Sequence, residues 1–349
     1  MLPKLSAAQG KPIMSENRAP ERYFYHSFPR RPQTEGHGHG LTILELIRDF
    51  GLLMTPEVAR WEYAHADGSP PRRQSMVQRR ISFTELAPAE LAGHAKDFGP
   101  FALEFDLDSL KRLGAIPVFY VPQAGEGHDA GGLGGTLMNH LIDAMRLTDR
   151  VAQMEAILSS APPDRVRQGI TIPIDTGPVL FDLDIKEARE ILRAISLGLA
   201  PARQLAAFLE GGLNYFYPAD GRDNAALQYY RQREWRMAGN VAVHNEEMMH
   251  VPSAAMIERL LALDVNFFGR PFPPAGEITS NVSLHGAPPQ RLADWCWVFQ
   301  EFDGKRALEW VRRVIVPAEA LTAATAILKP LSDAPPVVML ESLVSQAGQ

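Results

Sequence analysis

Short extended segments and short helical segments alternate along the first third of this chain, and proline or glycine closes most of them. Residues 22–28 are rich in aromatic side chains and end at Pro29, which is typical of a strand. Leu41 begins an amphipathic helix, and Gly51 is its expected stop. No regular strand–helix–strand repeat follows. The pattern therefore predicts the α+β class, with a mixed twisted sheet and flanking helices.

The rest of the chain continues this mixture. Predicted strands cover 80–84, 101–105, 116–121, 170–174, 179–183, 311–316 and 337–340. Predicted helices cover 86–96, 107–113, 136–158, 186–210, 253–263, 287–297 and 317–327. Predicted loops cover 29–40, the polar stretch 64–75 and the glycine-rich stretch 123–135. Pro117 and Pro122 bound one predicted strand, and proline favours strand ends and sheet edges.

The domain organisation follows from these segments. Residues 1–20 mix Pro, Gly, Ser and Lys without a period and predict a mobile arm. Residues 21–330 predict a single α+β domain, in which 123–215 are a candidate inserted helical subdomain. Residues 331–349 predict a C-terminal strand and tail.

Charge and composition exclude several classes of protein. The chain has 349 residues, one cysteine and a formal net charge of −6, so neither a disulfide framework nor a strong nucleic-acid partner is indicated. No stretch approaches the ~20 apolar residues of a membrane span, and the segment before Arg22 lacks a signal-peptide core. We expect a cytoplasmic protein without a membrane partner.

The sequence contains only weak indications of a metal-binding or phosphate-binding site. The glycine-rich loop could cradle a phosphate, but no lysine precedes Thr136, so a surface loop is the simpler interpretation. His37 and His39 flank one glycine, and His244 and His250 are six residues apart, which does not suit one helical face. We expect no metal site. Cys296 lies between two tryptophans and is predicted to be a core residue rather than a nucleophile.

Two clusters carry more chemistry. His26 lies near the end of the first predicted strand, on the face of Phe24 and Phe28 and opposite Tyr25 and Ser27, where it is either a ligand-binding or a structural histidine. In the stretch Tyr229–Arg236, an extended backbone would place Glu234 and Arg236 on one face. A carboxylate among arginines stays ionised at neutral pH, and it can stabilise a cation or anchor the fold through ion pairs.

These clusters occur in an order that resembles the AbiGi-type abortive phage-resistance proteins. The resemblance is carried by Tyr-His-Ser-Phe at 25–28, Ser-Phe-Thr-Glu at 82–85, the segment from His94 to Phe-Gly-Pro-Phe at 98–101, and Glu-Trp-Arg at 234–236. It covers residues 22–122 and 225–240, and more loosely 310–328. It implies a role in anti-phage defence, either as an effector or as an antitoxin or sensor that binds a toxin, antitoxin or phage protein.

The layout is also similar, more distantly, to ADP-ribosyltransferase-like proteins, in which a split α+β sheet clamps NAD. This similarity implies that NAD is a substrate. It implies that His26 holds the adenosine ribose, Arg80 the pyrophosphate and Glu234 the ribosyl cation. Tyr25 or Phe83 would stack on nicotinamide, with Ser27 and Arg236 completing the NAD-binding set. The assignment rests on analogy of layout.

Two other functions stay open. A non-catalytic defence component would use the Arg-rich and aromatic surface to bind a protein partner. A nuclease would need clustered acids for Mg²⁺, for which Asp182 and Asp184 are candidates, although alternating acids on a strand more often form a solvated face. Convergence of His26, Arg80 and Glu234 in one cleft would favour catalysis.

Overall fold

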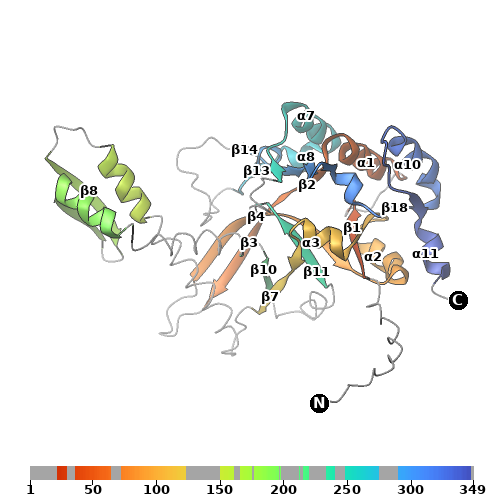
Figure 1. Cartoon of the computed structure of the whole chain (residues 1–349), viewed down its shortest axis with the longest axis horizontal. Coiled ribbons are helices and arrows are strands. Elements are labelled where there is room, and N and C mark those ends of the chain that lie inside the picture. Colours follow the sequence, from red (N-terminus) through yellow and green to blue (C-terminus); the bar gives the residue numbers. More distant parts are fainter. Residues whose placement is uncertain are drawn as a thin grey trace, which may run out of the picture.

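A computed structural model describes most of the predicted elements. The described residues are 22–29, 36–63, 72–122, 150–160, 166–174, 177–195, 197, 212, 215–219, 233–239, 248–274 and 290–346. They form an α+β structure with a mixed eight-strand sheet, several small sheets and flanking helices (Figure 1). The predicted N-terminal arm and glycine-rich loop lie outside the described residues.

The large sheet has the strand order β19-β18-β5-β1-β4-β11-β6, and β3 also pairs with β4. Its strands are β1 (Tyr23–Phe28), β3 (Pro56–Tyr63), β4 (Arg72–Glu85), β5 (Phe101–Asp106), β6 (Ile116–Pro117), β11 (Glu234–Ala238), β18 (Arg313–Val316) and β19 (Val337–Met339). All pairings are antiparallel except β18–β19. The predicted C-terminal strand is therefore an edge of this sheet. The predicted strand 116–121 is divided in two, and its first part, β6, is the other edge.

Strand β4 is longer than the sequence predicts. Its second half pairs with β1 and β11, and its first half pairs with β3 up to the pair Tyr63–Arg72. The prediction of a polar loop over 64–75 is wrong for residues 72–75, which belong to β4. Main-chain pairing with β3 extends the strand there, and this pairing needs no apolar pattern.

One face of the large sheet carries the main core. Alternate residues of β1, β4, β5 and β11 point to it. The buried members on these strands are Phe24, Phe28, Ile81, Phe83, Phe101, Leu103, Phe105, Trp235 and Met237. Helices α1 (Gly38–Phe50), α3 (Leu107–Arg112) and α10 (Leu321–Leu328) contribute Leu44, Leu110 and Leu328 to this core. Gly51 ends α1 with a φ of 99°, as predicted.

A second core packs beside the first. Its elements are β2 (Leu52–Met54), α7 (Ala254–Leu263), α8 (Val265–Phe268), α9 (Leu292–Trp295) and β15 (Trp297–Phe299), with β12 (Met249–His250) pairing β15. Cys296 is buried in this core, as predicted, and burial raises the pKa of its thiol to about 12. The predicted helix 287–297 is shorter in the described residues, because Gln290–Arg291 pair with β13 (Pro271–Phe272) as a strand and the chain is extended from Cys296.

Short elements connect these layers. They are η1 (Pro88–Glu90), β7 (Phe119–Pro122), β10 (Phe216–Ala219), β13 (Pro271–Phe272), β14 (Gln290–Arg291), β16 (Glu301–Phe302), β17 (Lys305–Arg306), η3 (Ala307–Trp310) and η4 (Ala318–Ala320). Strand β7 pairs with β10 in parallel. No helix in the described part of the chain is long and apolar enough to cross a membrane.

Residues 150–195 build a separate small unit (Figure 1). Helices at 150–159 and 185–195 pack through Leu158, Ile185 and Leu192. Between them, β8 (Arg167–Ile174) and β9 (Gly177–Asp184) form an antiparallel hairpin, which contains both predicted extended pieces. The candidate inserted subdomain thus contains strands as well as helices.

The second face of the large sheet is covered unevenly. Helices α2 (Leu91–Phe98) and α11 (Leu340–Gln346) place Leu91 and Leu343 against Tyr25 and Ile315. Over the neighbouring part of β4 and β11, the same face carries polar side chains and borders a cavity.

Candidate functional site

A cavity of about 540 Å³ lies over the polar side chains of β1, β4 and β11. Its volume is in the range of small-molecule sites. Helices α2 and α8 and the segment before β3 complete its walls. The lining residues are Tyr25, His26, Ser27, Leu53, Thr55, Pro56, Glu57, Arg80, Ser82, Thr84, His94, Phe98, Tyr217, Glu234, Arg236, Phe267 and Arg270.

Strand register explains why polar side chains meet here. Glu234 lies opposite Thr84, and Arg236 lies opposite Ser82, in the antiparallel pair β11–β4. Directly opposed residues share a face, and their neighbours along each strand point the other way. Glu234 and Arg236 therefore share one face, as predicted, while Trp235 enters the main core.

Glu234 is held by three groups. Its carboxylate accepts hydrogen bonds from Arg236 Nε (2.9 Å) and from the hydroxyl of Tyr120 (2.7 Å). Burial is the largest single effect and opposes ionisation of this carboxyl, but the charge and hydrogen bonds of its neighbours, Arg236 first among them, together outweigh it, so the pKa of Glu234 lies below its usual value. Hydrogen bonds from Ser82 and Tyr120 lower it further. Glu234 is thus a carboxylate at neutral pH.

Arg236 is almost wholly enclosed. Its side chain is 1% exposed, against 11% for Glu234. Burial lowers the pKa of the guanidinium, and so does the nearby charge of Arg80, while Glu234 acts in the opposite direction. The guanidinium lies 4.8 Å from the centre of the Tyr217 ring, in cation–π geometry.

Arg80 forms a second arginine–glutamate pair in the same cavity. Its guanidinium donates to the Glu57 carboxylate and, at 2.6 Å, to the buried Gln78 amide oxygen. It also lies 5.1 Å from the centre of the Tyr217 ring. The Tyr217 hydroxyl donates to Glu57 at 3.2 Å. One tyrosine ring therefore contacts the guanidinium groups of both pairs.

His26 lies where β1 and β4 part. The ladder between these strands ends at the pair Tyr25–Thr84, although both strands continue beyond it. His26 Nδ1 donates to the main-chain oxygen of Ser82 at 3.0 Å. A carbonyl only accepts hydrogen bonds, so Nδ1 carries a proton in this contact.

Ser27 and Tyr25 also line the cavity. The Ser27 hydroxyl lies 3.4 Å from His94 Nδ1, and the His94 ring stacks on Phe98 with 4.2 Å between centroids. Tyr25 is 1% exposed, so it forms part of the wall and offers little surface to a ligand.

The prediction that Phe83 stacks on a ligand is wrong. Phe83 does not line the cavity, because it belongs to the opposite face of β4 and is fully buried against Phe105. Side chains alternate along a strand, so residues 80 and 83 cannot share a face of a regular strand. Phe83 therefore supports the core and cannot stack on a ligand in this cavity.

The sequence reasoning missed five residues that shape the site: Glu57, His94, Tyr120, Tyr217 and Arg270. They come from β3, α2, β7, β10 and the chain after α8. Two signals were available: His94 begins one of the segments that carry the resemblance, and Phe119-Tyr120 and Phe216-Tyr217 form an aromatic pairing of β7 and β10. Neither signal shows which elements these residues join.

The candidate metal ligands do not gather here. Asp182 forms an exposed ion pair with Arg167, and Asp184 accepts a hydrogen bond from the amide of Glu187. His37 precedes α1 and lies 3.6 Å from Glu319. His244 lies outside the described residues. Within the described ranges, no group of three or more His, Cys, Asp or Glu side chains could hold a metal ion.

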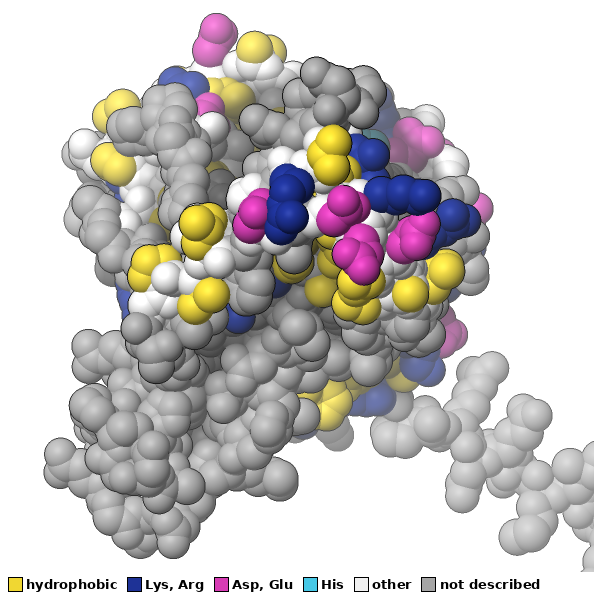
Figure 2. Space-filling view, turned by 90° about the vertical axis from the view of Figure 1, so that its left-hand side faces the viewer, with side chains coloured by type: hydrophobic (Ala, Val, Ile, Leu, Met, Phe, Trp, Pro, Cys, Tyr) yellow, Lys and Arg dark blue, Asp and Glu magenta, His cyan; other side chains and the backbone are white. Residues whose placement is uncertain are grey.

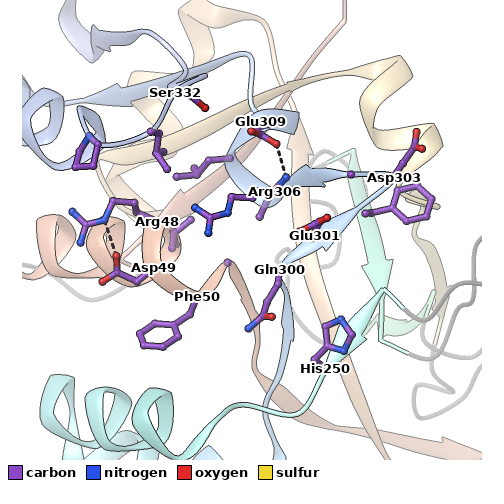
Figure 3. A pocket seen from close by; sticks show the side chains of 18 residues that line it. Arg48, Asp49, Phe50, His250, Gln300, Glu301, Asp303, Arg306, Glu309 and Ser332 are labelled. Atoms are coloured by element: carbon purple, nitrogen blue, oxygen red, sulfur yellow. Dashed lines mark hydrogen bonds and ion pairs between the residues drawn. The ribbon is translucent and has the colours of Figure 1, made fainter.

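A second cavity, of about 830 Å³, lies at the end of α1 (Figure 3). Arg48 pairs there with Asp49, and the amide of Arg306 donates to Glu309. Its walls also include His250 and the turn between β16 and β17. None of the predicted site residues lines it. The cavity on β1, β4 and β11 is therefore the candidate active site.

No family model, curated protein or solved structure matches this chain. The chemistry of the site is therefore argued from its own residues.

Proposed function

We propose that this protein is an NAD-consuming enzyme of the ADP-ribosyltransferase-like type that acts in anti-phage defence. The observation that carries the proposal is convergence. His26, Arg80 and Glu234 come from three neighbouring strands and line one cavity, with Glu234 held as a carboxylate. The parting of β1 from β4 at His26 is consistent with the split sheet that the resemblance implies.

The proposed reaction breaks the bond between C1′ of the ribose and the nicotinamide nitrogen of NAD. The electron pair leaves with nicotinamide, and positive charge develops on the ribose ring. The acceptor, which is water in a glycohydrolase or a side chain in a transferase, then bonds to C1′ and loses its proton to solvent. A fixed anion stabilises this developing cation, because it needs no reorganisation during the reaction.

The described residues suit this chemistry. Glu234 supplies the anion, and Tyr120 and Arg236 hold its carboxylate in place. In this proposal His26 contacts the ribose, and Arg80 lines the same cavity. Helices α2 and α8 flank the cavity.

The alternative is a non-catalytic antitoxin or sensor that binds a protein partner. One observation favours it: Glu234 forms a buried ion pair with Arg236, and such a pair can be purely structural. The role in defence, in either form, rests on the resemblance of residues 22–122 and 225–240. Cytoplasmic location remains a prediction.

NAD turnover by purified full-length protein tests the proposal, with and without phage lysate. We expect turnover by the wild type and at least a hundredfold loss in Glu234→Gln, which keeps the size of the side chain and removes its charge. Tyr120→Phe keeps the carboxylate and removes one hydrogen bond, so we expect a smaller loss, of about tenfold.

Folding must be controlled, because Glu234→Gln leaves Arg236 without its anion. Circular dichroism and thermal unfolding give the folded fraction of each variant. Arg233→Gln is the control, since Arg233 directly precedes the same strand and forms an exposed ion pair with Glu90. No turnover under any condition, together with intact phage protection by Glu234→Gln cells, would refute the enzymatic proposal and favour the binding alternative.

A further inference from the structure

The arginine side chains that line the cavity differ in whether a carboxylate neutralises their charge. Arg80 pairs with Glu57, and Arg236 pairs with Glu234. Both guanidinium groups therefore already face a carboxylate. The remaining arginine of the lining, Arg270, forms no ion pair within the part of the chain that the structure describes.

Arg270 reaches the cavity from a different layer than the sheet. It follows α8, and its main-chain oxygen accepts a hydrogen bond from the amide of Leu292 at 2.9 Å. Its guanidinium lies 4.6 Å from the centre of the Phe267 ring. Phe267 is held in turn, because its amide donates to Asp264 Oδ1 at 2.9 Å and its ring meets Phe268 edge-on.

This arrangement of Arg270 on Phe267 suits the binding of an anion. A guanidinium stacked on an aromatic ring keeps its in-plane N–H donors available, and these donors match the oxygens of a phosphate. The Arg80 guanidinium, in contrast, already donates hydrogen bonds to Glu57 and Gln78. Among the described residues, no carboxylate neutralises the charge of Arg270. An anion that enters the cavity can therefore pair with this guanidinium.

We propose that Arg270 is the principal phosphate-binding residue of this cavity, and that its ligand is a pyrophosphate-bearing nucleotide. Arg80 then acts mainly as a positioning residue, because it holds Glu57 and Tyr217 against the second pair. This inference rests on the proposed function for the identity of the nucleotide, but not for the recognition of phosphate.

Calorimetric titration of the full-length protein tests the inference, with inorganic pyrophosphate, ADP-ribose and nicotinamide as probes. We expect Arg270→Gln to raise the Kd of pyrophosphate and ADP-ribose at least tenfold and to leave the Kd of nicotinamide within twofold. Arg270→Lys should recover part of the affinity, since it keeps the charge and loses the bidentate geometry.

Arg259→Gln is the matched control. Arg259 lies on α7 in the same layer, pairs with Asp49 and does not line the cavity, so its loss changes net charge equally. We expect a change of less than twofold. Equal effects of Arg270→Gln and Arg259→Gln, or no binding of pyrophosphate and ADP-ribose by the wild type at millimolar concentration, would overturn the inference.

The two proposals fail in different ways. Arg270-dependent binding of pyrophosphate without any NAD turnover would support the phosphate site and remove the proposed reaction. NAD turnover with an unchanged KM in Arg270→Gln would support the reaction and remove Arg270 from phosphate binding.

Discussion

At the residue scale, paired arginine and glutamate side chains define the candidate site. Two arginine–glutamate pairs line one cavity, and the ring of Tyr217 contacts both guanidinium groups. A buried charge is costly unless it is paired, so each arginine requires its glutamate. The same pairing keeps Glu234 ionised, which is the property that the proposed chemistry needs.

The pH dependence of stability tests the state of Glu234. Its pKa in the folded protein lies below the unfolded value of 4.5, so the unfolded state binds more protons in this window. The contribution of Glu234 is present above pH 4.5 and disappears as pH falls through the folded pKa. We expect Glu234→Gln to be clearly less stable than the wild type at pH 7, and the difference to shrink as pH falls below 4.5 through the folded pKa.

Urea unfolding across this range measures the difference. The carboxyls of Glu85 and Asp49 also have lowered pKa values, but both variants retain them, so their effect cancels in the comparison. A stability difference that does not change with pH would show that Glu234 is not the group that titrates.

At the element scale, the turn from α1 into β2 depends on one glycine. Gly51 has a φ of 99°, and a Cβ atom there would lie 2.1 Å from the main-chain oxygen of Phe299 on β15. An alanine would therefore separate α1 from the small sheet. Gly304, with a φ of 68° and nothing within 4 Å of a Cβ, shares the positive φ without the contact.

This contrast gives a prediction. Gly304→Ala should cost about 1 kcal/mol, from the left-handed backbone alone. Gly51→Ala should cost at least about 3 kcal/mol, because backbone strain adds to a clash with main-chain atoms that cannot rotate away. Urea unfolding of both variants gives the two values, and similar losses would contradict the close approach of α1 and β15.

At the scale of the whole molecule, the cavity lies between the large sheet and the second core. On the face that Figure 2 shows, Lys and Arg side chains lie among Asp and Glu side chains, without a broad patch of one sign in its described part. None of the described lining residues comes from 123–214, although these residues connect β7 to β10. The described residues of the hairpin unit therefore contribute no wall to the site.

Replacing residues 124–213 by a flexible linker of about 20 residues tests this separation, since a parallel crossover needs a dozen residues or more. We expect a cooperative thermal unfolding transition and a Kd for ADP-ribose within threefold of the full-length value. The full-length protein is the reference in both measurements. Loss of binding in a variant that still unfolds cooperatively would show that the replaced segment takes part in the site.

Several features could be predicted from the sequence, because they depend on local periodicity. The alternation along residues 234–236 placed Glu234 and Arg236 together, and a glycine closed α1. The burial of Cys296 followed from its tryptophan neighbours. The same alternation, applied to 80 and 83, would have separated Arg80 from Phe83, so that error was avoidable.

Only the tertiary structure decided which strands are neighbours. The sequence determined that Glu234 and Arg236 share a face, but the register of β11 against β4 placed them over Ser82 and Thr84. Glu57, Tyr217 and Arg270 entered the site through contacts between segments far apart in the chain. Periodicity reports the face of one element, whereas register and layer packing are set by long-range burial, which no local pattern encodes.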